Sequence, residues 1–247
     1  MAMSEITPAA DARRPQIAFL AAMKQEIAPL VRGWTTREFV HDGRRYRLYQ
    51  DGDRENGGPV LICSGIGAEH GRRATEAVIQ ETRPAKMISV GFAGALIASL
   101  KVADVVEPRL VINAADGART DTGHGEGSVV SSPAVAGRDQ KLRLASAYGA
   151  VAVDMEGASV AQGAQAHGIE FAALKAISDP LDFQLPPIDP FVSARGEFRW
   201  ARFVLHVAVR PWLWARTIAL GVNSARASRA LSAAIENYLK RESPAAN

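Results

Sequence analysis

The sequence predicts an α/β fold with three layers, in which helices cover both faces of a central, mixed and largely parallel twisted sheet. Short apolar runs recur along the 247 residues, and most lack the polar alternation of strands that face water on one side. Several runs are followed by helical patterns, an order typical of sheets covered on both sides. No linker or internal repeat divides the chain, so we expect a single domain over residues 16–247, after a polar and disordered N-terminus at residues 1–15.

Apolar runs give the expected strands, and two segments between them have helical spacing. Good helix formers fill residues 68–81, and an alanine-rich helix over 157–167 is expected to end at Gly168, a suitable residue for a C-cap. Ligands of such sheets bind beyond the carboxyl ends of the strands, so the residues there are the first candidates for a site. The expected strands are residues 17–21, 60–63, 87–90, 102–106, 150–153 and 171–177.

The composition limits the chemistry that the chain can support. Cys63 is the single cysteine, which excludes a disulfide framework or a thiolate cluster within the chain. The five histidines are scattered without the spacing of metal ligands, so we expect neither a metal nor another cofactor. The apolar run at 17–23 is too short and poorly placed for a signal peptide, and we therefore expect a cytoplasmic protein.

Glycines and one acid follow the first three of the long apolar runs. Glu26 falls in the first turn of a short helix, where the helix dipole favours an acid whatever its function. Gly67 lies in a turn whose backbone NH groups could approach a sugar or phosphate, although the spacing is not that of a dinucleotide-binding loop. Gly91 and Phe92 open a stretch of mostly small residues, Gly91-Phe92-Ala93-Gly94. Turn geometry or packing alone could explain each of these features.

Acids follow the two later runs, and here a purely structural explanation is weaker. Asp154 and Glu156 bracket Met155, and two such carboxylates would cost several kcal/mol if buried without partners. A ribose diol would satisfy one of them, whereas helix capping by Asp154 accounts for only one of the two. Asp179 ends the last run before a proline, where burial could keep it partly protonated and able to donate to a leaving group, or where it could simply form a turn.

Taken together, these segments resemble the superfamily of purine nucleoside phosphorylases and methylthioadenosine nucleosidases in type and order. The resemblance covers residues 17 to about 182 and implies a nucleoside phosphorylase-like three-layer fold. It rests on five segments of the chain: Ala22-Met23-Lys24-Gln25-Glu26, Gly65-Ile66-Gly67, Gly91-Phe92-Ala93-Gly94, Val153-Asp154-Met155-Glu156 and Ala176-Ile177-Ser178-Asp179.

The resemblance also implies roles for the candidate residues in cleaving a purine nucleoside. Glu156 would hold the ribose hydroxyls while Met155 packs on the sugar. Asp179, positioned by Ser178, would donate a proton to the purine N7, and Glu26 would activate water. We expect Gly67, Gly91 and Phe92 to line the same substrate site. Protonation of the base and carboxylates beside a positive sugar both favour departure of adenine.

Two departures from the superfamily pattern favour water over phosphate as the acceptor. Ser89 stands where phosphorylases of the superfamily have an arginine, and Phe92 stands where many members have serine. Both changes remove phosphate ligands and leave Glu26 as the activator of the nucleophile. Arg72 and Arg73 near a helix start could still receive phosphate, which keeps a phosphorylase as the alternative.

The C-terminal segment at 195–223 is cationic and aromatic and does not belong to the nucleosidase pattern. On one continuous helix its basic residues would form a narrow stripe beside a wide apolar face, with a break or restart at Pro211. The segment could lie in a membrane interface, or it could be a core or dimer helix with solvated arginines, and nucleic-acid binding is the least favoured reading. Arginine interrupts it too often for a membrane span. The stripe consists of Arg195, Arg199, Arg202, His206 and Arg210.

Residues 178–187 followed by this segment resemble the hopanoid-associated branch of the superfamily, which removes adenine from adenosylhopane. This resemblance implies a purine nucleoside substrate with a lipid tail, and it favours the alternative of peripheral membrane contact, through residues 198–220, at the inner face of the membrane. The superfamily resemblance implies a homodimer or larger homo-oligomer. The alternatives are methylthioadenosine/adenosylhomocysteine nucleosidase activity and a membrane-attached nucleoside binder without catalysis. A dinucleotide-dependent oxidoreductase is disfavoured by the glycine spacing.

Overall fold

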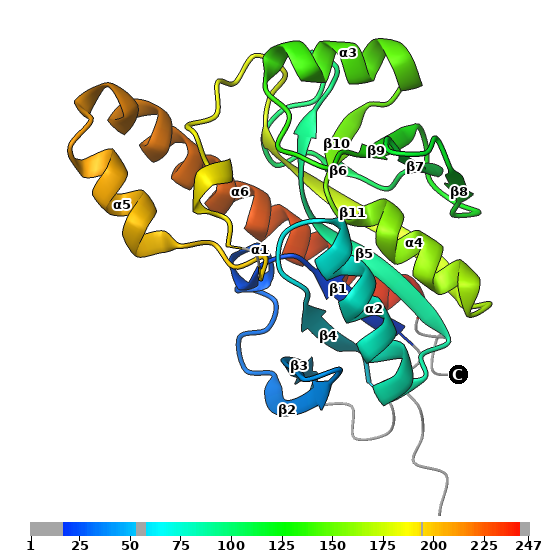
Figure 1. Ribbon diagram of the computed structural model, residues 1–247. Coiled ribbons are helices and arrows are strands. Elements are labelled where there is room, and N and C mark those ends of the chain that lie inside the picture. The colour runs from blue at the N-terminus through cyan, green and yellow to red at the C-terminus, as the bar shows by residue number, and fades with distance from the viewer. Residues whose placement is uncertain (1–16, 53–57, 194, 243–247) are drawn as a thin grey trace, which may run out of the picture.

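The computed structural model describes residues 17–52, 58–193 and 195–242, and it contains the sheet and both helical layers that the sequence predicts (Figure 1). The expected disordered N-terminus at 1–15 lies outside the described residues. The strands are β1 (Ile17–Ala21), β2 (Thr35–His41), β3 (Arg44–Gln50), β4 (Val60–Cys63), β5 (Lys86–Ala95), β6 (Val105–Val106), β7 (Leu110–Asn113), β8 (Arg119–Asp121), β9 (Ser128–Ser131), β10 (Ala152–Asp154) and β11 (Glu170–Asp179). The helices are α1 (Lys24–Ile27), α2 (Ala68–Thr82), α3 (Arg138–Tyr148), α4 (Gly157–Ala166), the 3-10 turn η1 (Asp189–Phe191), α5 (Trp200–Ala208) and α6 (Pro211–Glu242).

The strands form one mixed sheet, with the long strand β5 at its centre. The order is β2-β3-β4-β1-β5-β10-β9-β7-β8, and β11 pairs with β5 beside this path. The strands β4, β1, β5 and β11 are joined by parallel pairings, and β10 runs antiparallel to β5 but parallel to β9. The prediction of a mixed, largely parallel sheet is confirmed.

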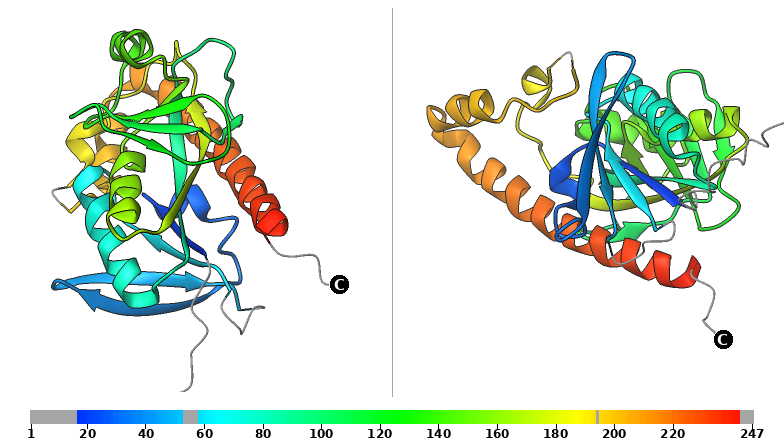
Figure 2. Two further views of the ribbon diagram at one scale, coloured as in Figure 1. Left: turned by 90° about the vertical axis from the view of Figure 1, so that its right-hand side faces the viewer. Right: turned by 90° about the horizontal axis from the view of Figure 1, so that it is seen from below.

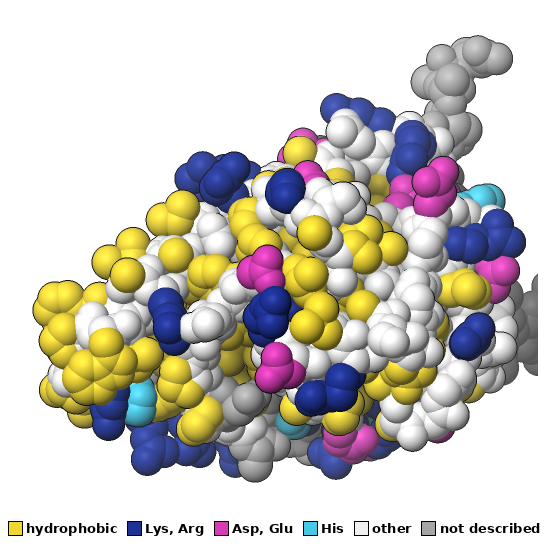
Figure 3. All heavy atoms as spheres, turned by 90° about the horizontal axis from the view of Figure 1, so that it is seen from above, with side chains coloured by type: hydrophobic (Ala, Val, Ile, Leu, Met, Phe, Trp, Pro, Cys, Tyr) yellow, Lys and Arg dark blue, Asp and Glu magenta, His cyan; other side chains and the backbone are white. Residues whose placement is uncertain are grey.

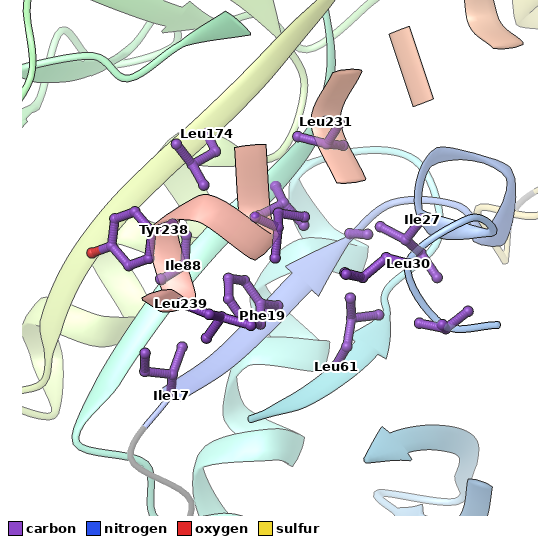
Figure 4. Close-up of a cluster of buried hydrophobic side chains, with 14 of the residues drawn as sticks. Ile17, Phe19, Ile27, Leu30, Leu61, Ile88, Leu174, Leu231, Tyr238 and Leu239 are labelled. Atoms are coloured by element: carbon purple, nitrogen blue, oxygen red, sulfur yellow. The ribbon is translucent and has the colours of Figure 1, made fainter. Parts of the chain in front are cut away.

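Two apolar cores hold the helices against opposite faces of this sheet. Leu20, Met87 and Ala173 belong to the core that includes residues of α2 and α4. The strand residues between these, such as Phe19 and Ile88, point to the other face and belong to the core under α6 (Figure 4). Leu231 and Tyr238 of α6 are buried in this second core. Because successive strand side chains point to opposite faces, the near-continuous apolar runs supply both cores at once.

The structure corrects the expected strand at 102–106 and adds elements that the apolar runs did not indicate. Within 102–106 only Val105–Val106 is a strand, because residues 102–103 form a turn in which Ala103 has φ of +76°. The hairpin β2–β3 was not expected, since β2 is an edge strand with mostly exposed side chains and no apolar run. The short strands β7 to β9 and the helix α3 were also missed. By contrast, α2 and α4 match the predicted helices, and Gly168 takes φ of +65° just after α4.

The C-terminal segment is two helices, as Pro211 predicts, but the expected basic stripe is only partly helical. The turn at Arg195 and Gly196 and the bridge between Val192 and Phe198 hold this stretch outside a helix. Since α5 begins at Trp200, neither Arg195 nor Arg199 lies on it, and the prediction of one continuous stripe was wrong. No helix in the described part of the chain has the length and apolarity to cross a membrane.

Candidate active site

The candidate acids follow β1 and β10 or end β11, and two of them contact a glycine-bearing stretch of β5. A Cβ atom on Gly91, which has φ of +149°, would stand 3.0 Å from Glu26 Oε1. A Cβ on Gly94 would stand 2.8 Å from Asp179 Oδ2. Both carboxylates therefore lie directly against the β5 backbone, which only glycine permits at these distances. The Gly91-Phe92-Ala93-Gly94 motif brings Glu26 and Asp179 to one short stretch of strand.

Glu26 serves both as a helix-start residue and as a buried carboxylate of the site. Its Oε2 accepts a hydrogen bond from the backbone N of Met23 at 2.8 Å, as expected at the start of α1. Its Oε1 accepts one from the backbone N of Phe92 at 3.0 Å, which ties it to β5. Burial raises the pKa of Glu26, and these backbone hydrogen bonds and the charge of Lys175 oppose the rise. The carboxylate is thus placed where it can take up a proton.

Glu156 lies at the start of α4 and reaches the loop after β4. Its Oε1 accepts a hydrogen bond from the backbone N of Gly67 at 2.6 Å. Burial, with smaller contributions from the charges of Asp154 and Glu26, raises the pKa of Glu156 to about 8. A ligand that donates hydrogen bonds to this side chain would favour the ionised form of Glu156.

The raised pKa of Glu156 predicts a pH-dependent stability. The folded protein holds this proton up to about pH 8, whereas the unfolded chain releases it near the ordinary value of 4.5. The free energy of unfolding should therefore fall as the pH rises from about 4.5 to about 8, by on the order of a few kcal/mol for this group. Urea unfolding across this range should show that Glu156→Gln flattens the dependence and is more stable than the wild type at high pH. Glu236→Gln, at an exposed position of α6, is the control and should keep the wild-type profile.

Asp179 is held at the end of β11 by a bulge, a serine and a buried lysine. The register between β11 and β5 shifts between Ile177 and Asp179. Ser178 Oγ donates to Asp179 Oδ1 at 2.7 Å, and Lys141 Nζ donates to Oδ2 at 2.5 Å. Lys141, on α3, is 1% exposed and also donates to the carbonyl of Pro180. A buried cationic partner, Lys141, therefore lies beside Asp179, which the sequence-based expectation did not include.

A second buried ion pair fixes the strand end that carries Glu156. Lys175 Nζ lies 2.6 Å from Asp154 Oδ2 and donates to Ser89 Oγ at 2.8 Å. Asp154 also accepts hydrogen bonds from the backbone N of Gly157 and from Ser131 Oγ. Asp154 thus bonds the first residue of α4, as the capping alternative expects, but the N-cap position is Glu156, and Lys175 and Ser131 are further partners of Asp154. Removing one partner of such a pair typically costs about 3–5 kcal/mol, so the start of α4 is firmly placed.

The remaining predicted residues lie around the carboxylates or on other surfaces. Phe92 is half-buried and packs against the core under α6. Met155 lines a surface cleft of about 430 Å³ between α2 and α4, and none of the three catalytic candidates lines that cleft. Arg72 and Arg73 are exposed on α2, and both pair with Glu69, at 3.0 and 2.7 Å. The structure therefore places Glu26 against Gly91, Glu156 against Gly67, and Asp179 against Ser178 and Gly94, and leaves Met155 oriented toward the cleft.

Two functional candidates escaped the sequence analysis, Lys141 and Lys175. A signal for Lys175 was present, because a lysine within the apolar run 171–177 must be buried with a partner. Lys141 lies on α3, a helix without a strong apolar pattern, and carried no such signal. No group of three or more His, Cys, Asp or Glu side chains in residues 17–52, 58–193 and 195–242 is arranged to hold a metal ion.

Comparison with known families assigns the chain to one superfamily. The family model described as "Phosphorylase superfamily" matches residues 16–138 and 126–187. The chain belongs to the phosphorylase superfamily. The predictions of this superfamily, of its three-layer fold and of an enzyme are confirmed.

Curated relatives in the superfamily are nucleosidases. The chain is 28% identical over 202 residues to the 5'-methylthioadenosine/S-adenosylhomocysteine nucleosidase of Glaesserella parasuis. The aligned region covers 68% of this chain and 86% of the relative. The nucleosidase of the same name from Actinobacillus succinogenes is 27% identical over 203 residues, with the same coverage.

Solved structures of the superfamily share the fold. The futalosine hydrolase of Helicobacter pylori matches with a TM-score of 0.67 at 20% identity, over 92% of this chain and 98% of that one. The S-adenosylhomocysteine nucleosidase of Streptococcus pyogenes matches with a TM-score of 0.69 at 19% identity, over 95% and 100%. At these identities the likeness concerns the fold alone.

Proposed function

We propose that this member of the phosphorylase superfamily cleaves the bond between a purine base and ribose in a nucleoside, with water as the acceptor. One observation carries the proposal: three buried carboxylates follow or end strands of the sheet and lie against glycines of β5 or of the loop after β4, and we propose that they act on one substrate. Glu26 and Asp179 lie against β5, and Glu156 is bonded to Gly67. The curated relatives named as nucleosidases support the same reaction.

Each of the three carboxylates has a separate role in the displacement of the base from C1′. Asp179 gives a proton to N7 of the purine, so the base leaves with the electrons of the bond to C1′. Glu156 accepts hydrogen bonds from the ribose hydroxyls, and its negative charge stabilises the positive sugar. Water attacks C1′, and its proton passes to Glu26. Exchange with solvent then removes this proton from Glu26 and returns one to Asp179 before the next turnover. Each proton transfer contributes roughly 10²- to 10⁴-fold to the rate.

Features around Ser89 and α2 support water as the acceptor. Ser89 occupies the place where the resemblance puts an arginine in phosphorylases, and its hydroxyl is bonded to Lys175, whose charge Asp154 balances. Arg72 and Arg73 are both engaged by Glu69. A binder without catalysis would need Glu156 alone, so the presence of Glu26 and Asp179 favours an enzyme.

The proposed substrate is an adenine nucleoside with a lipid tail, adenosylhopane, and the proposed place of action is the inner face of the membrane. The resemblance of residues 178–187 and of the following segment to the hopanoid-associated branch supports this choice. The exposed apolar side chains of α5 and α6 support it as well, since a polycyclic tail needs an apolar route beside a polar ribose site. Assembly as a homodimer or larger homo-oligomer stays a prediction.

Release of free adenine tests substrate and acceptor together. The enzyme is supplied with adenosine, methylthioadenosine, adenosylhomocysteine and adenosylhopane, each with and without phosphate. We expect adenine and a free sugar without phosphate, and the highest kcat/KM for adenosylhopane. Turnover that requires phosphate and yields ribose 1-phosphate would identify a phosphorylase. Preference for methylthioadenosine would assign the activity for which the curated relatives are named.

A further inference from the structure

The N-terminal half of α6 extends beyond the sheet and carries α5 with it (Figures 1 and 2). The buried positions of the C-terminal half recur from Ala227 to Leu239 and pack against β11 and β5. From 211 to 226 only Leu213 is buried, and at about 1.5 Å per residue this part is roughly 24 Å long. The two helices thus form a projecting hairpin with one end on the enzyme.

The hairpin has a small core of its own, which makes it a defined structure. Phe203, Val207 and Leu213 are buried together with Phe191 of η1. Trp214 Nε1 donates to the carbonyl of Val207 at 3.0 Å and ties α6 to α5. The exposed side chains of the hairpin are therefore presented on a folded support.

Its outer surface is unusually apolar. Eight of the ten large hydrophobic side chains that are exposed in the described part of the chain lie between Trp200 and Val222. We define the apolar tip as five of these side chains, which come from α5, from the turn after it and from the first half of α6: Leu205, Val209, Trp212, Trp214 and Ile218, which are 49–70% exposed. Figure 3 shows hydrophobic side chains gathered at this end of the molecule, with basic side chains beside them. Contiguous exposed apolar surface of this kind marks an interaction site.

The charges around the tip decide which partner fits. Between Glu197 and Glu236 the sequence has no acid, and it has six arginines: Arg199, Arg202, Arg210, Arg216, Arg226 and Arg229. In a two-fold contact between two copies, the same patch would meet itself, and arginines would oppose arginines with no acid to balance them. An anionic bilayer supplies both an apolar interior and phosphate groups, and tryptophan favours its interface.

We infer that the α5–α6 hairpin docks the enzyme on an anionic lipid bilayer, with the apolar tip inserted at headgroup depth and the arginines on lipid phosphates. The segment just before α5 contacts the loop after β4, which carries Gly67. The backbone N of Ile66 donates to the carbonyl of Gly196 at 2.9 Å, and the Arg44 side chain donates to the carbonyls of both Ser64 and Arg195. Gly67, the partner of Glu156, follows in the same loop. The substrate side of this inference, a lipid-tailed nucleoside arriving from the bilayer, rests on the proposed function.

Co-sedimentation of the full-length protein with phosphatidylcholine vesicles, with and without phosphatidylglycerol, tests the docking. We expect at least about tenfold stronger partition onto the anionic vesicles, which weakens with salt. The double variant Val209→Ser/Trp212→Ala should lose about tenfold or more of this partition, and Arg202→Gln/Arg216→Gln should lose the preference for anionic lipid. Val40→Ser, at an equally exposed hydrophobic residue of β2, is the matched control and should bind as the wild type.

Equal partition onto both vesicles, or equal binding by the Val209→Ser/Trp212→Ala variant and the wild type, would overturn the docking. A change in molecular mass on sedimentation in the tip variant, without lipid, would instead assign the tip to a second copy of the chain. Adenine release from soluble adenosine is measured on the same samples. If that activity is present while vesicle binding is absent, only the docking fails, whereas loss of adenine release in the wild type counts against the proposed function.

Discussion

Replacing Asp179 with asparagine is expected to lower kcat for adenine release by about 10²- to 10⁴-fold, with a much smaller effect on KM. Asparagine keeps the size of the side chain and one oxygen, which can accept from either Lys141 or Ser178, but it has no carboxylic proton to deliver to the departing base. The steady-state rate of adenine formation, followed by a coupled assay, gives both parameters. Circular dichroism and urea unfolding confirm that the variant is folded.

The matched control for this prediction is Asp182→Asn. Asp182 lies three positions further along the chain, is exposed, and pairs with Arg138 at 3.0 Å. It should keep kcat within about threefold of the wild type, since surface pairs contribute little. If Asp179→Asn also kept kcat within that range, Asp179 would not be the proton donor.

Glu26→Gln is expected to lower kcat/KM by about 10²- to 10⁴-fold, because the amide cannot take a proton from water. The loss of kcat/KM should come from the missing base and not from a change in structure. A small nucleophile that needs no deprotonation should therefore react without Glu26. In Glu26→Ala, which leaves space beside Gly91, added azide should restore part of the turnover and give a ribosyl azide. Product analysis by mass spectrometry measures the rescue.

Glu236→Gln again serves as the control, and azide should leave its rate unchanged. Absence of rescue in Glu26→Ala, together with a normal urea unfolding transition, would argue that Glu26 acts through its hydrogen bonds to Met23 and Phe92 and not as a base. The raised pKa of Glu26 agrees with a group that can hold a proton during turnover.

The sequence was most informative where one local pattern determines both structure and position in the fold. The runs that became β1, β4, β5 and β11 are buried on both faces, so they lack polar alternation and were recognised as strands. Their order with α2 and α4 then located the strand ends. The acids Glu26, Glu156 and Asp179 were found because they follow these strands.

What escaped the sequence analysis depends on contacts between distant segments. The partner of Asp179, Lys141, is 38 positions away on a helix without a clear apolar face, and only the folded chain brings the two together. The edge strand β2 is largely exposed, so it lacks the apolar run by which the buried strands are predicted. The basic stripe was extended too far because Arg195 and Arg199 fit a helical period, while the bond from Ile66 to Gly196 and the turn there hold them outside the helix.

The most direct test is a crystal structure of the protein with a purine nucleoside analogue whose glycosidic bond cannot be cleaved. We expect the ribose hydroxyls within hydrogen-bond distance of the Glu156 carboxylate and the purine N7 within hydrogen-bond distance of Asp179, with a water molecule between Glu26 and the anomeric carbon. A nucleoside bound with its base and sugar away from Glu156 and Asp179, for example in the cleft beside Met155, would contradict the assignment of these side chains to one reaction.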